Sequence, residues 1–243
     1  FFIGFNISFV FKNKKKTVGI VSAFFLTFIC WIVLTLIGSF PFFLGSTSLT
    51  FIDSFFESMS GMTTTGATVI QNLDETSRSI LIWRSMLQWL GGIGIIVIAI
   101  AVFPMLKVGG MQLFRSEFSS KDDKILPRTV SIAIGIGLVY LVLTITCFLS
   151  LVSAGMDVFD GIAHALTIIA TGGFSTKNMS IGHFNSLYIE AVTIFFMLIS
   201  SLPFLLLFQF SKGKVLDLLK NSQVHFFILI VFILTIITSF WLQ

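Results

Sequence analysis

Residues 63–68 read Thr-Thr-Thr-Gly-Ala-Thr, and residues 170–175 read Ala-Thr-Gly-Gly-Phe-Ser. These two short runs rich in Thr and Gly lie in an otherwise hydrophobic chain, and they are its most informative feature. The interval from Asp53 to Gly66 equals the interval from Asp160 to Gly173. Thr and Gly supply carbonyl oxygens and an adaptable backbone with almost no side-chain charge. A pore needs such groups to replace the water around a monovalent cation. The two runs therefore predict two segments of an ion-selectivity filter.

The composition of the chain indicates an integral membrane protein. Of its 243 residues, 56% are hydrophobic, 11% are charged and 30 are Phe, and the mean hydropathy is +1.02. Soluble domains carry about 25% charged residues. Because the first residue is Phe and not Met, we expect the sequence to begin inside a longer protein. Residues 1–17 would then be the remnant of a preceding helix followed by a basic cytoplasmic segment.

Five apolar segments are long enough to cross a bilayer as helices, at 18–40, 80–104, 129–153, 187–210 and 223–242. Twelve of the 15 Lys and Arg residues lie in three places: before the first segment, between the second and third, and between the fourth and fifth. These residues are Lys12, Lys14, Lys15, Lys16, Lys107, Arg115, Lys121, Lys124, Arg128, Lys212, Lys214 and Lys220. By the positive-inside rule these parts are cytoplasmic, so the connections 41–79 and 154–186 leave and return on the outer side.

Each outer connection has the pattern of a re-entrant pore loop. Asp53–Met62 is helix-like and would be about 15 Å long, or half a bilayer. Non-helical backbone can return from that depth only where protein or a water-filled cavity surrounds it. The predicted fold is therefore all-α and integral to the membrane, with tandem span–pore loop–span units, two complete and the first helix of a third. The corresponding boundaries are 1–17, 18–104 for the first unit, 105–128 for a cytoplasmic loop, 129–210 for the second unit, and 211–243 for a cytoplasmic loop and the incomplete third unit.

Eight residues form the predicted potassium-binding filter, and three acidic residues are expected to support it. The filter residues are Thr64, Thr65, Gly66, Ala67, Thr171, Gly172, Gly173 and Phe174. The carbonyls of Thr64, Thr65, Thr171 and Gly172 are the candidate ion ligands, because Gly66 and Gly173 allow neighbouring carbonyls to turn toward the axis. Asp53 and Asp160 are expected to cap the half-helices, whereas Glu57, an acid at membrane depth, is expected to hold the filter backbone. The alternatives are that Thr and Gly only mark loops or helix contacts, and that the acids attract cations to the outer mouth.

Other residues carry structural expectations. We expect Arg84 to snorkel, Pro104 to mark the inner end of the second span and Pro203 to kink the fourth. Small residues allow helices to approach closely, so packing sites are predicted at Gly91, Gly92, Gly94, Gly135 and Gly137. The three His residues lack metal-ligand spacing, and no nucleotide-binding or nucleophile motif occurs, so no enzyme and no cofactor other than the transported potassium are expected.

Three stretches resemble one family of transporters. They are DSFFESMSGMTTTGATVI (53–70), WRSMLQWLGGIGIIVIAIAVFPMLKVGGMQLFRSE (83–117) and DVFDGIAHALTIIATGGFST (157–176). With them the chain resembles the TrkH-type subunit of the Trk/Ktr/HKT superfamily of potassium transporters, over nearly its whole length. The resemblance implies four units around one potassium pathway, a homodimer, a cytosolic nucleotide-binding regulatory subunit (TrkA-like), and a location in the cell inner (plasma) membrane.

Because two complete units are present where the family has four, two functions stay open. The first is potassium transport as a membrane subunit of a Trk-type uptake system. The alternative is a truncated, non-conducting membrane remnant that needs a missing C-terminal half. The charged loop 105–128 is the expected contact for the regulatory subunit, or for anionic membrane lipid, and no nucleic-acid partner is expected.

Overall fold

Residues 20–106 and 125–241 are described by the structure, a computed structural model, and their regular elements are all helical. Segment 1–17 and loop residues 107–124, for which the sequence predicts a basic segment and a regulatory contact, lie outside the described residues. In chain order the helices are α2 (Ile20–Leu44), α3 (Phe51–Met62), η1 (Leu73–Glu75), α4 (Arg78–Leu106), α6 (Ile125–Ser153), α7 (Val158–Ile169), η3 (Ser180–Phe184), α8 (Leu187–Ser200), α9 (Phe204–Ser211), α10 (Val215–Leu219) and α11 (Ser222–Trp241).

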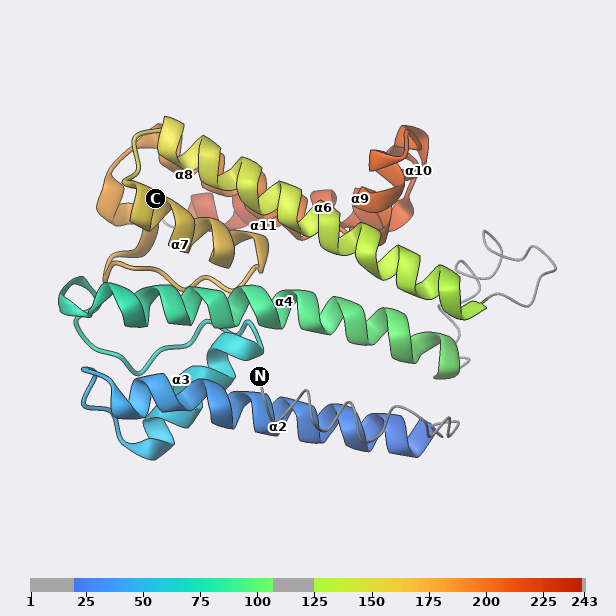
Figure 1. The fold of residues 1–243 in the computed structure, drawn as a ribbon. Helices are drawn as coiled ribbons and strands as arrows, with labels where there is room; N and C mark the ends of the chain where they lie inside the picture. Colours follow the sequence, from blue (N-terminus) through green and yellow to red (C-terminus); the bar gives the residue numbers. More distant parts are fainter. Residues whose placement is uncertain (1–19, 107–124, 242–243) are drawn as a thin grey trace.

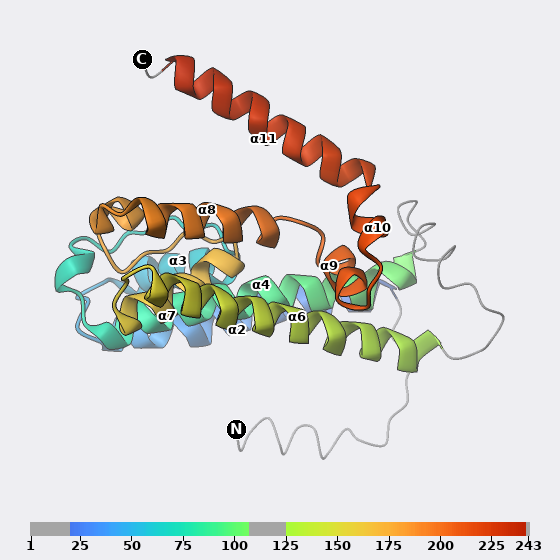
Figure 2. The ribbon, with the colours of Figure 1, turned by 90° about the horizontal axis from the view of Figure 1, so that it is seen from above.

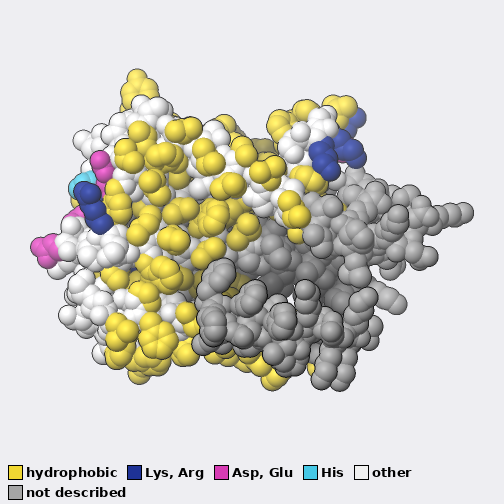
Figure 3. Space-filling model, viewed as in Figure 1, with side chains coloured by type: hydrophobic (Ala, Val, Ile, Leu, Met, Phe, Trp, Pro, Cys, Tyr) yellow, Lys and Arg dark blue, Asp and Glu magenta, His cyan; other side chains and the backbone are white. Residues whose placement is uncertain are grey.

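The hydropathy and length of the helices fit a membrane. Among the described residues, Phe24–Leu44, Ile132–Ser153 and Ser222–Trp241 are long and apolar enough to span it, and α8 with α9 makes a fourth span if the bent pair counts as one. The helix α4 has 29 residues, of which the side chains from position 95 onward lie outside the description. The space-filling view shows a broad hydrophobic surface between charged side chains at one end and lysines near α10 at the other (Figure 3). An apolar belt between charged ends is the surface that a bilayer requires.

Helix α4 lies in the middle of the bundle. It runs between α2 and α3 on one side and α6 and α7 on the other (Figure 1), and it contacts all four. The short helices α3 and α7 have 12 residues each, which corresponds to about 18 Å, well under a bilayer thickness. Helix α11 extends away from the others (Figure 2), with 6% of its apolar window buried.

Two hydrophobic cores lie on either side of α4, and α4 contributes to both. One core contains Phe42 from α2, Met62 from α3 and Leu87 from α4. The other is built around Tyr140 and other residues of α6, α7 and α8, and Trp89 and Ile93 of α4 pack against it. Because successive side chains on a helix point in different directions, one helix can bury residues in both cores.

The glycine prediction is confirmed at three of five positions. A Cβ at Gly91 would overlap the Met62 carbonyl oxygen, and a Cβ at Gly92 would lie 2.7 Å from the Tyr140 hydroxyl. Gly135 is likewise covered by the ring of Phe208. At Gly94 a Cβ would meet no atom within 4 Å, and at Gly137 the nearest is Ile93 at 3.7 Å, so neither glycine is required for close packing.

The two proline predictions have different outcomes. Pro203 breaks the fourth apolar segment instead of kinking it, because α8 ends at Ser200, α9 begins at Phe204, and the two are bent by 96°. Pro203 is the N-cap residue of α9, a position where a missing N–H removes no helical hydrogen bond. Pro104 lies in the last turn of α4, which ends at Leu106, so its position agrees with the prediction that it marks the end of the second span.

Candidate ion-selectivity site

The two predicted filter segments have the same backbone conformation. Thr64 and Thr171 both have a positive φ, at 56° and 55°, and so do Gly66 and Gly173, at 77° and 79°. The left-handed region is unfavourable for a residue with a Cβ. A Thr held there in both copies shows that the same loop is built twice, as the equal spacing of the aspartates and glycines predicts.

Backbone hydrogen bonds explain how each loop turns back from its helix. The amide of Thr65 donates to the Ser60 carbonyl at 3.0 Å, and the amide of Gly172 donates to the Thr167 carbonyl at 3.0 Å. Both bonds reach the last turn of the preceding helix, whose final carbonyls have no partner within the helix. Each loop thus stays tied to the C-terminal end of its own short helix, α3 or α7.

The capping residues differ from those predicted. At α3 the N-cap is Thr50, whose hydroxyl accepts from the Asp53 amide at 3.2 Å. At α7 the N-cap is Asp157, whose carboxylate accepts from the Phe159 amide at 3.1 Å. Asp53 and Asp160 lie in the first turns, each three residues after the cap. An acid there still complements the helix dipole, but the capping assignment from the sequence is wrong.

Asp160 does not cap α7 but binds the outer end of the second loop. Its carboxylate accepts a hydrogen bond from the Thr176 hydroxyl at 2.7 Å and lies 3.6 Å from the Lys177 ammonium. Asp53, by contrast, accepts only from the Thr50 hydroxyl at 2.6 Å among the described residues. The first aspartate therefore stabilises the start of its helix, and the second also fixes the outer part of its loop.

The carbonyls of the two loops fall into two groups. Ala67 accepts from the Ser60 hydroxyl at 2.6 Å, and Gly172 accepts from the Gln88 side-chain amide at 3.0 Å. Among the eight predicted filter residues, the other six carbonyls accept no hydrogen bond from the described part of the chain: those of Thr64, Thr65, Gly66, Thr171, Gly173 and Phe174. Of the four carbonyls that the sequence predicts as ion ligands, only that of Gly172 accepts a hydrogen bond from the described residues.

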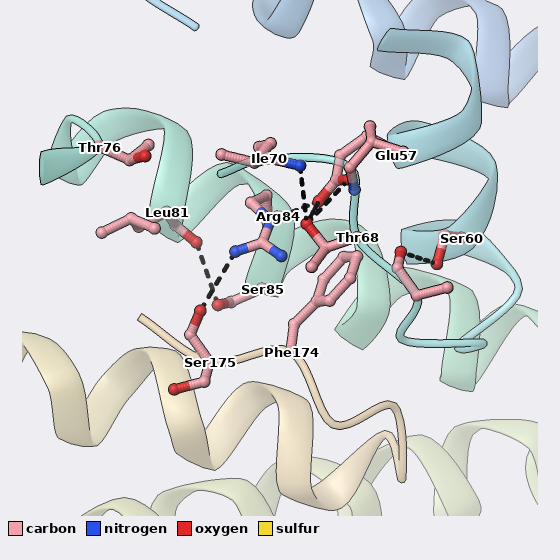
Figure 4. Close-up of polar contacts among 12 residues, drawn as sticks. Glu57, Ser60, Thr68, Ile70, Thr76, Leu81, Arg84, Ser85, Phe174 and Ser175 are labelled. Carbon is pink, nitrogen blue, oxygen red and sulfur yellow. Dashed lines mark hydrogen bonds and ion pairs between the residues drawn. The ribbon is translucent and has the colours of Figure 1, made fainter. Parts of the chain in front are cut away.

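The first loop is held by a buried ion pair. Glu57 on α3 accepts from the Val69 amide at 2.9 Å and from the Thr68 hydroxyl at 3.0 Å. Its other close partner is Arg84 on α4, whose Nε lies 2.7 Å from the carboxylate; the two side chains are 0% and 1% exposed. Figure 4 shows Glu57 beside Thr68 of the loop and Ile70, with Arg84 close by. The sequence predicts this role for Glu57, and Arg84 neutralises its charge.

The second loop is held by different chemistry in the equivalent place. His164 follows Asp160 by the same interval as Glu57 follows Asp53. Its Nε2 lies 2.9 Å from the Ser175 hydroxyl, and its Nδ1 lies 2.8 Å from the Asp160 carbonyl. Ser175 occupies the position that corresponds to Thr68. An imidazole and a hydroxyl therefore replace the carboxylate and hydroxyl of the first loop.

Three functional residues were not predicted as such from the sequence. Arg84 was expected to snorkel, but it is 1% exposed and its guanidinium points into the protein. The spacing of the His residues predicts no metal site, so His164 receives no role from it. Its interval from Asp160, equal to that from Asp53 to Glu57, is the sequence feature that places it in the position corresponding to Glu57. Gln88 carries no sequence signal, since its role depends on a contact with a loop 84 residues away.

Comparison with known proteins places the chain in a family. The model of the TrkH family, described as cation transport protein, matches residues 1–243. The chain belongs to the TrkH family. It is 43% identical to the Trk system potassium uptake protein TrkH of Escherichia coli (strain K12), over 94% of this chain and 48% of that protein. It is 38% identical to TrkG of the same strain, over 99% of this chain and 52% of that protein.

A solved structure agrees. The crystal structure of the potassium transporter TrkH from Vibrio parahaemolyticus matches with a TM-score of 0.79 and 38% identity, over 93% of this chain and 46% of that one. The chain spans about half the length of the TrkH relatives that it matches. Family membership and the apolar helices identify a multi-pass membrane protein, and a location in the inner membrane fits the bacterial relatives. These relatives are transporters and not enzymes, as predicted from the sequence.

Proposed function

We propose that this chain forms part of a potassium uptake pathway, in which the loops 63–69 and 170–176 are two segments of the selectivity filter. The observation that carries the proposal is that six of the eight predicted filter carbonyls have no hydrogen-bond donor among the described residues. Unpaired carbonyl oxygens that face an open space are free to coordinate a cation. A dehydrated potassium ion is a suitable partner, because it needs a cage of such oxygens.

The exposure of the loops supports this assignment. Thr65, Thr171 and Gly173 are exposed in the structure, although they belong to the segments between the two buried cores. A Cβ at Gly173 would meet no atom within 4 Å. The loops therefore present backbone to an open space, as the lining of a pathway must. The C-terminal ends of α3 and α7, which lead into the loops, carry the negative end of the helix dipole and favour a cation nearby.

The proposal extends to the architecture. The order of span, short helix, loop and span occurs at α2–α3–α4 and again at α6–α7–α8, where α8 has 14 residues and reaches the length of a span only together with α9. We take these as two span–pore loop–span units, with α11 as the first helix of a third. Two units provide part of the wall of an ion pathway, so the remaining wall must come from further chain. By resemblance we also propose a homodimer and a cytosolic nucleotide-binding regulatory subunit. Co-purification of differently tagged copies, and of such a subunit, tests both.

Growth on limiting potassium tests the function. The chain is expressed in a potassium-uptake-deficient bacterial strain, alone and together with the C-terminal half of Vibrio parahaemolyticus TrkH. We expect rescue only when both parts are present. Membrane-inserted protein that rescues under neither condition would favour the non-conducting remnant instead.

A matched pair of glycine variants tests the filter assignment. Gly173 and Gly213 have φ values of 79° and 85°, and a Cβ at either meets no atom within 4 Å. Gly173→Asp and Gly213→Asp therefore introduce the same charge and similar backbone strain. We expect Gly173→Asp to abolish rescue and Gly213→Asp, which is outside both loops, to preserve it. Equal growth of the two variants would contradict the assignment of loop 170–176 to the filter.

A further inference from the structure

Two side chains of α4 cross from the first unit to the loop of the second. Arg84 and Gln88 lie four residues apart, on one face of the helix, and are 1% and 0% exposed. Helix α4 follows the first loop in the chain, yet both side chains hydrogen-bond to residues 172–175. Both polar ends of the Gln88 side chain and the Nε and Nη1 of Arg84 are hydrogen-bonded, whereas Nη2 of Arg84 is buried without a hydrogen-bond partner among the described residues.

Gln88 binds the second loop on both sides of its central glycine. Its Nε2 donates to the Gly172 carbonyl at 3.0 Å, and its Oε1 accepts from the Phe174 amide at 3.2 Å. The side-chain amide thus replaces the two hydrogen bonds that a neighbouring strand would make. Between these two contacts lies Gly173, whose carbonyl accepts no hydrogen bond from the described residues. The contacts hold the peptide planes on either side of Gly173 in one orientation.

Arg84 links the two loops, the second directly and the first through Glu57. Its Nε binds Glu57, which holds the first loop, at 2.7 Å, and its Nη1 donates to the Ser175 carbonyl in the second loop at 3.1 Å. The guanidinium carbon also lies 4.1 Å from the centre of the Phe174 ring, within the range of a cation–π interaction. Figure 4 shows the guanidinium between Glu57 and Ser175, beside Phe174. A Lys could pair with Glu57, but its single ammonium could not reproduce this planar set of contacts.

The two loops also touch directly. A Cβ built on Gly66 would overlap the Gly172 carbonyl oxygen, the same oxygen that Gln88 binds. Any rotation of the Gly172 peptide therefore affects the backbone of the first loop. The contact and the two side chains of α4 join the loops into one unit.

We propose that Arg84 and Gln88 are positioning residues that couple the two filter loops, so that the geometry of the second loop is set by a helix of the first unit. Their role is to fix which carbonyls face the ion, and hence the preference for potassium over sodium. The coupling itself is a structural statement, and only its effect on ion preference rests on the proposed function.

Hydrogen–deuterium exchange of the full chain, purified from membranes in detergent, measures the coupling without any ion transport. Peptides covering 66–72 and 172–177 report on the Val69 and Phe174 amides, which donate to Glu57 and Gln88. Three variants are compared with the unchanged chain: Gln88→Leu, Arg84→Lys and Arg84→Gln. The control is Tyr140→Phe, which removes a buried hydrogen bond to the Trp89 carbonyl on α4 but touches neither loop.

We expect a different pattern from each variant. Gln88→Leu and Arg84→Lys should speed exchange in 172–177 roughly tenfold, the effect of about one lost buried hydrogen bond, and should speed exchange in 66–72 by a smaller factor through the contact of Gly66 with Gly172. Arg84→Gln should speed exchange in both peptides, because Glu57 loses its counter-charge. Tyr140→Phe should change neither peptide selectively.

Two results would overturn the inference. One is exchange in 172–177 that Gln88→Leu and Arg84→Lys leave unchanged. The other is an equal increase in both peptides with Tyr140→Phe, which would mean that the variants act by loosening the whole bundle. Neither Arg84→Lys nor Gln88→Leu changes the charge next to Glu57. These two variants therefore test the inference even if Arg84→Gln fails to fold.

A transport assay then tests the effect on ion preference. In the growth assay described above, Gln88→Leu should lower the sodium concentration that halves potassium-dependent growth, and Tyr140→Phe should leave it unchanged. An unaltered sodium tolerance in Gln88→Leu, together with faster exchange, would refute the effect on selectivity. Failure of the unchanged chain to rescue growth would count against the proposed function and leave the exchange result valid.

Discussion

The replacement of Gly66 by Ala is the sharpest test of how the two loops fit together. Gly66 has a φ of 77°, and a Cβ there would overlap the backbone carbonyl oxygen of Gly172. The left-handed backbone alone costs about 1–2 kcal/mol for a residue with a Cβ. Because the obstacle is backbone and cannot rotate away, we add the overpacking cost of about 1–3 kcal/mol. The expected loss in the free energy of unfolding is therefore about 2–5 kcal/mol.

Gly173→Ala is the matched control. Its φ of 79° is nearly the same, but a Cβ there meets no atom within 4 Å. Only the backbone term remains, so we expect a loss of about 1–2 kcal/mol. The difference between the two variants isolates the contact between the loops, since the substitution and the backbone conformation are shared.

Thermal unfolding of the purified chain in detergent, followed by size-exclusion chromatography, measures the difference. Gly66→Ala should melt at a clearly lower temperature than Gly173→Ala, which in turn should melt below the unchanged chain. Equal melting temperatures for the two variants would refute the close approach of Gly66 to Gly172. A neutral Gly66→Ala would also contradict the left-handed backbone at this position.

The remaining predictions use the same unfolding measurement. Glu57→Gln should destabilise the chain by about 3–5 kcal/mol, because Arg84 is left buried and unpaired. The double variant Glu57→Gln/Arg84→Gln should lose less stability than the sum of the two single variants. Additive losses would argue against the ion pair. Gly91→Ala should cost about 1–3 kcal/mol through overlap with the last carbonyl of α3, whereas Gly94→Ala, which meets no atom within 4 Å, should be neutral or slightly stabilising; the reverse order would refute the packing of α4 on α3. Asp157→Ala should cost about 1 kcal/mol as the loss of an N-cap, and Asp157→Asn should restore most of it; if neither variant changes the melting temperature, the cap is not formed.

The asymmetry between the two loops has a physical basis in their partners. The first is held by a carboxylate, which needs a counter-charge when buried, and Arg84 supplies it from α4. The second is held by His164, whose Nε2 lies 2.9 Å from the Ser175 hydroxyl, and the Ser175 carbonyl accepts from Nη1 of Arg84. Two loops with nearly identical backbone angles therefore depend on one arginine in different ways.

The sequence alone was sufficient for the membrane setting, the apolar helices and the doubled loop. The hydropathy of a segment reflects the solvent that surrounds it, so the apolar segments indicate a membrane. The equal intervals from Asp53 to Gly66 and from Asp160 to Gly173 indicate that the same loop occurs twice. The role of Glu57 also followed, because an acid at membrane depth must find a partner nearby. All these properties are local, or repeat along the chain, so pattern can reveal them.

Only the tertiary structure decided which residues join the loops. Arg84 and Gln88 reach loop residues 91 and 84 positions away, and no periodicity records such a pairing. The capping residues and the break at Pro203 also depended on the path of the backbone, which propensities do not resolve to within a few residues. The sequence indicates two potential filter loops, whereas their contact with each other follows from how α4 packs against both α3 and α7.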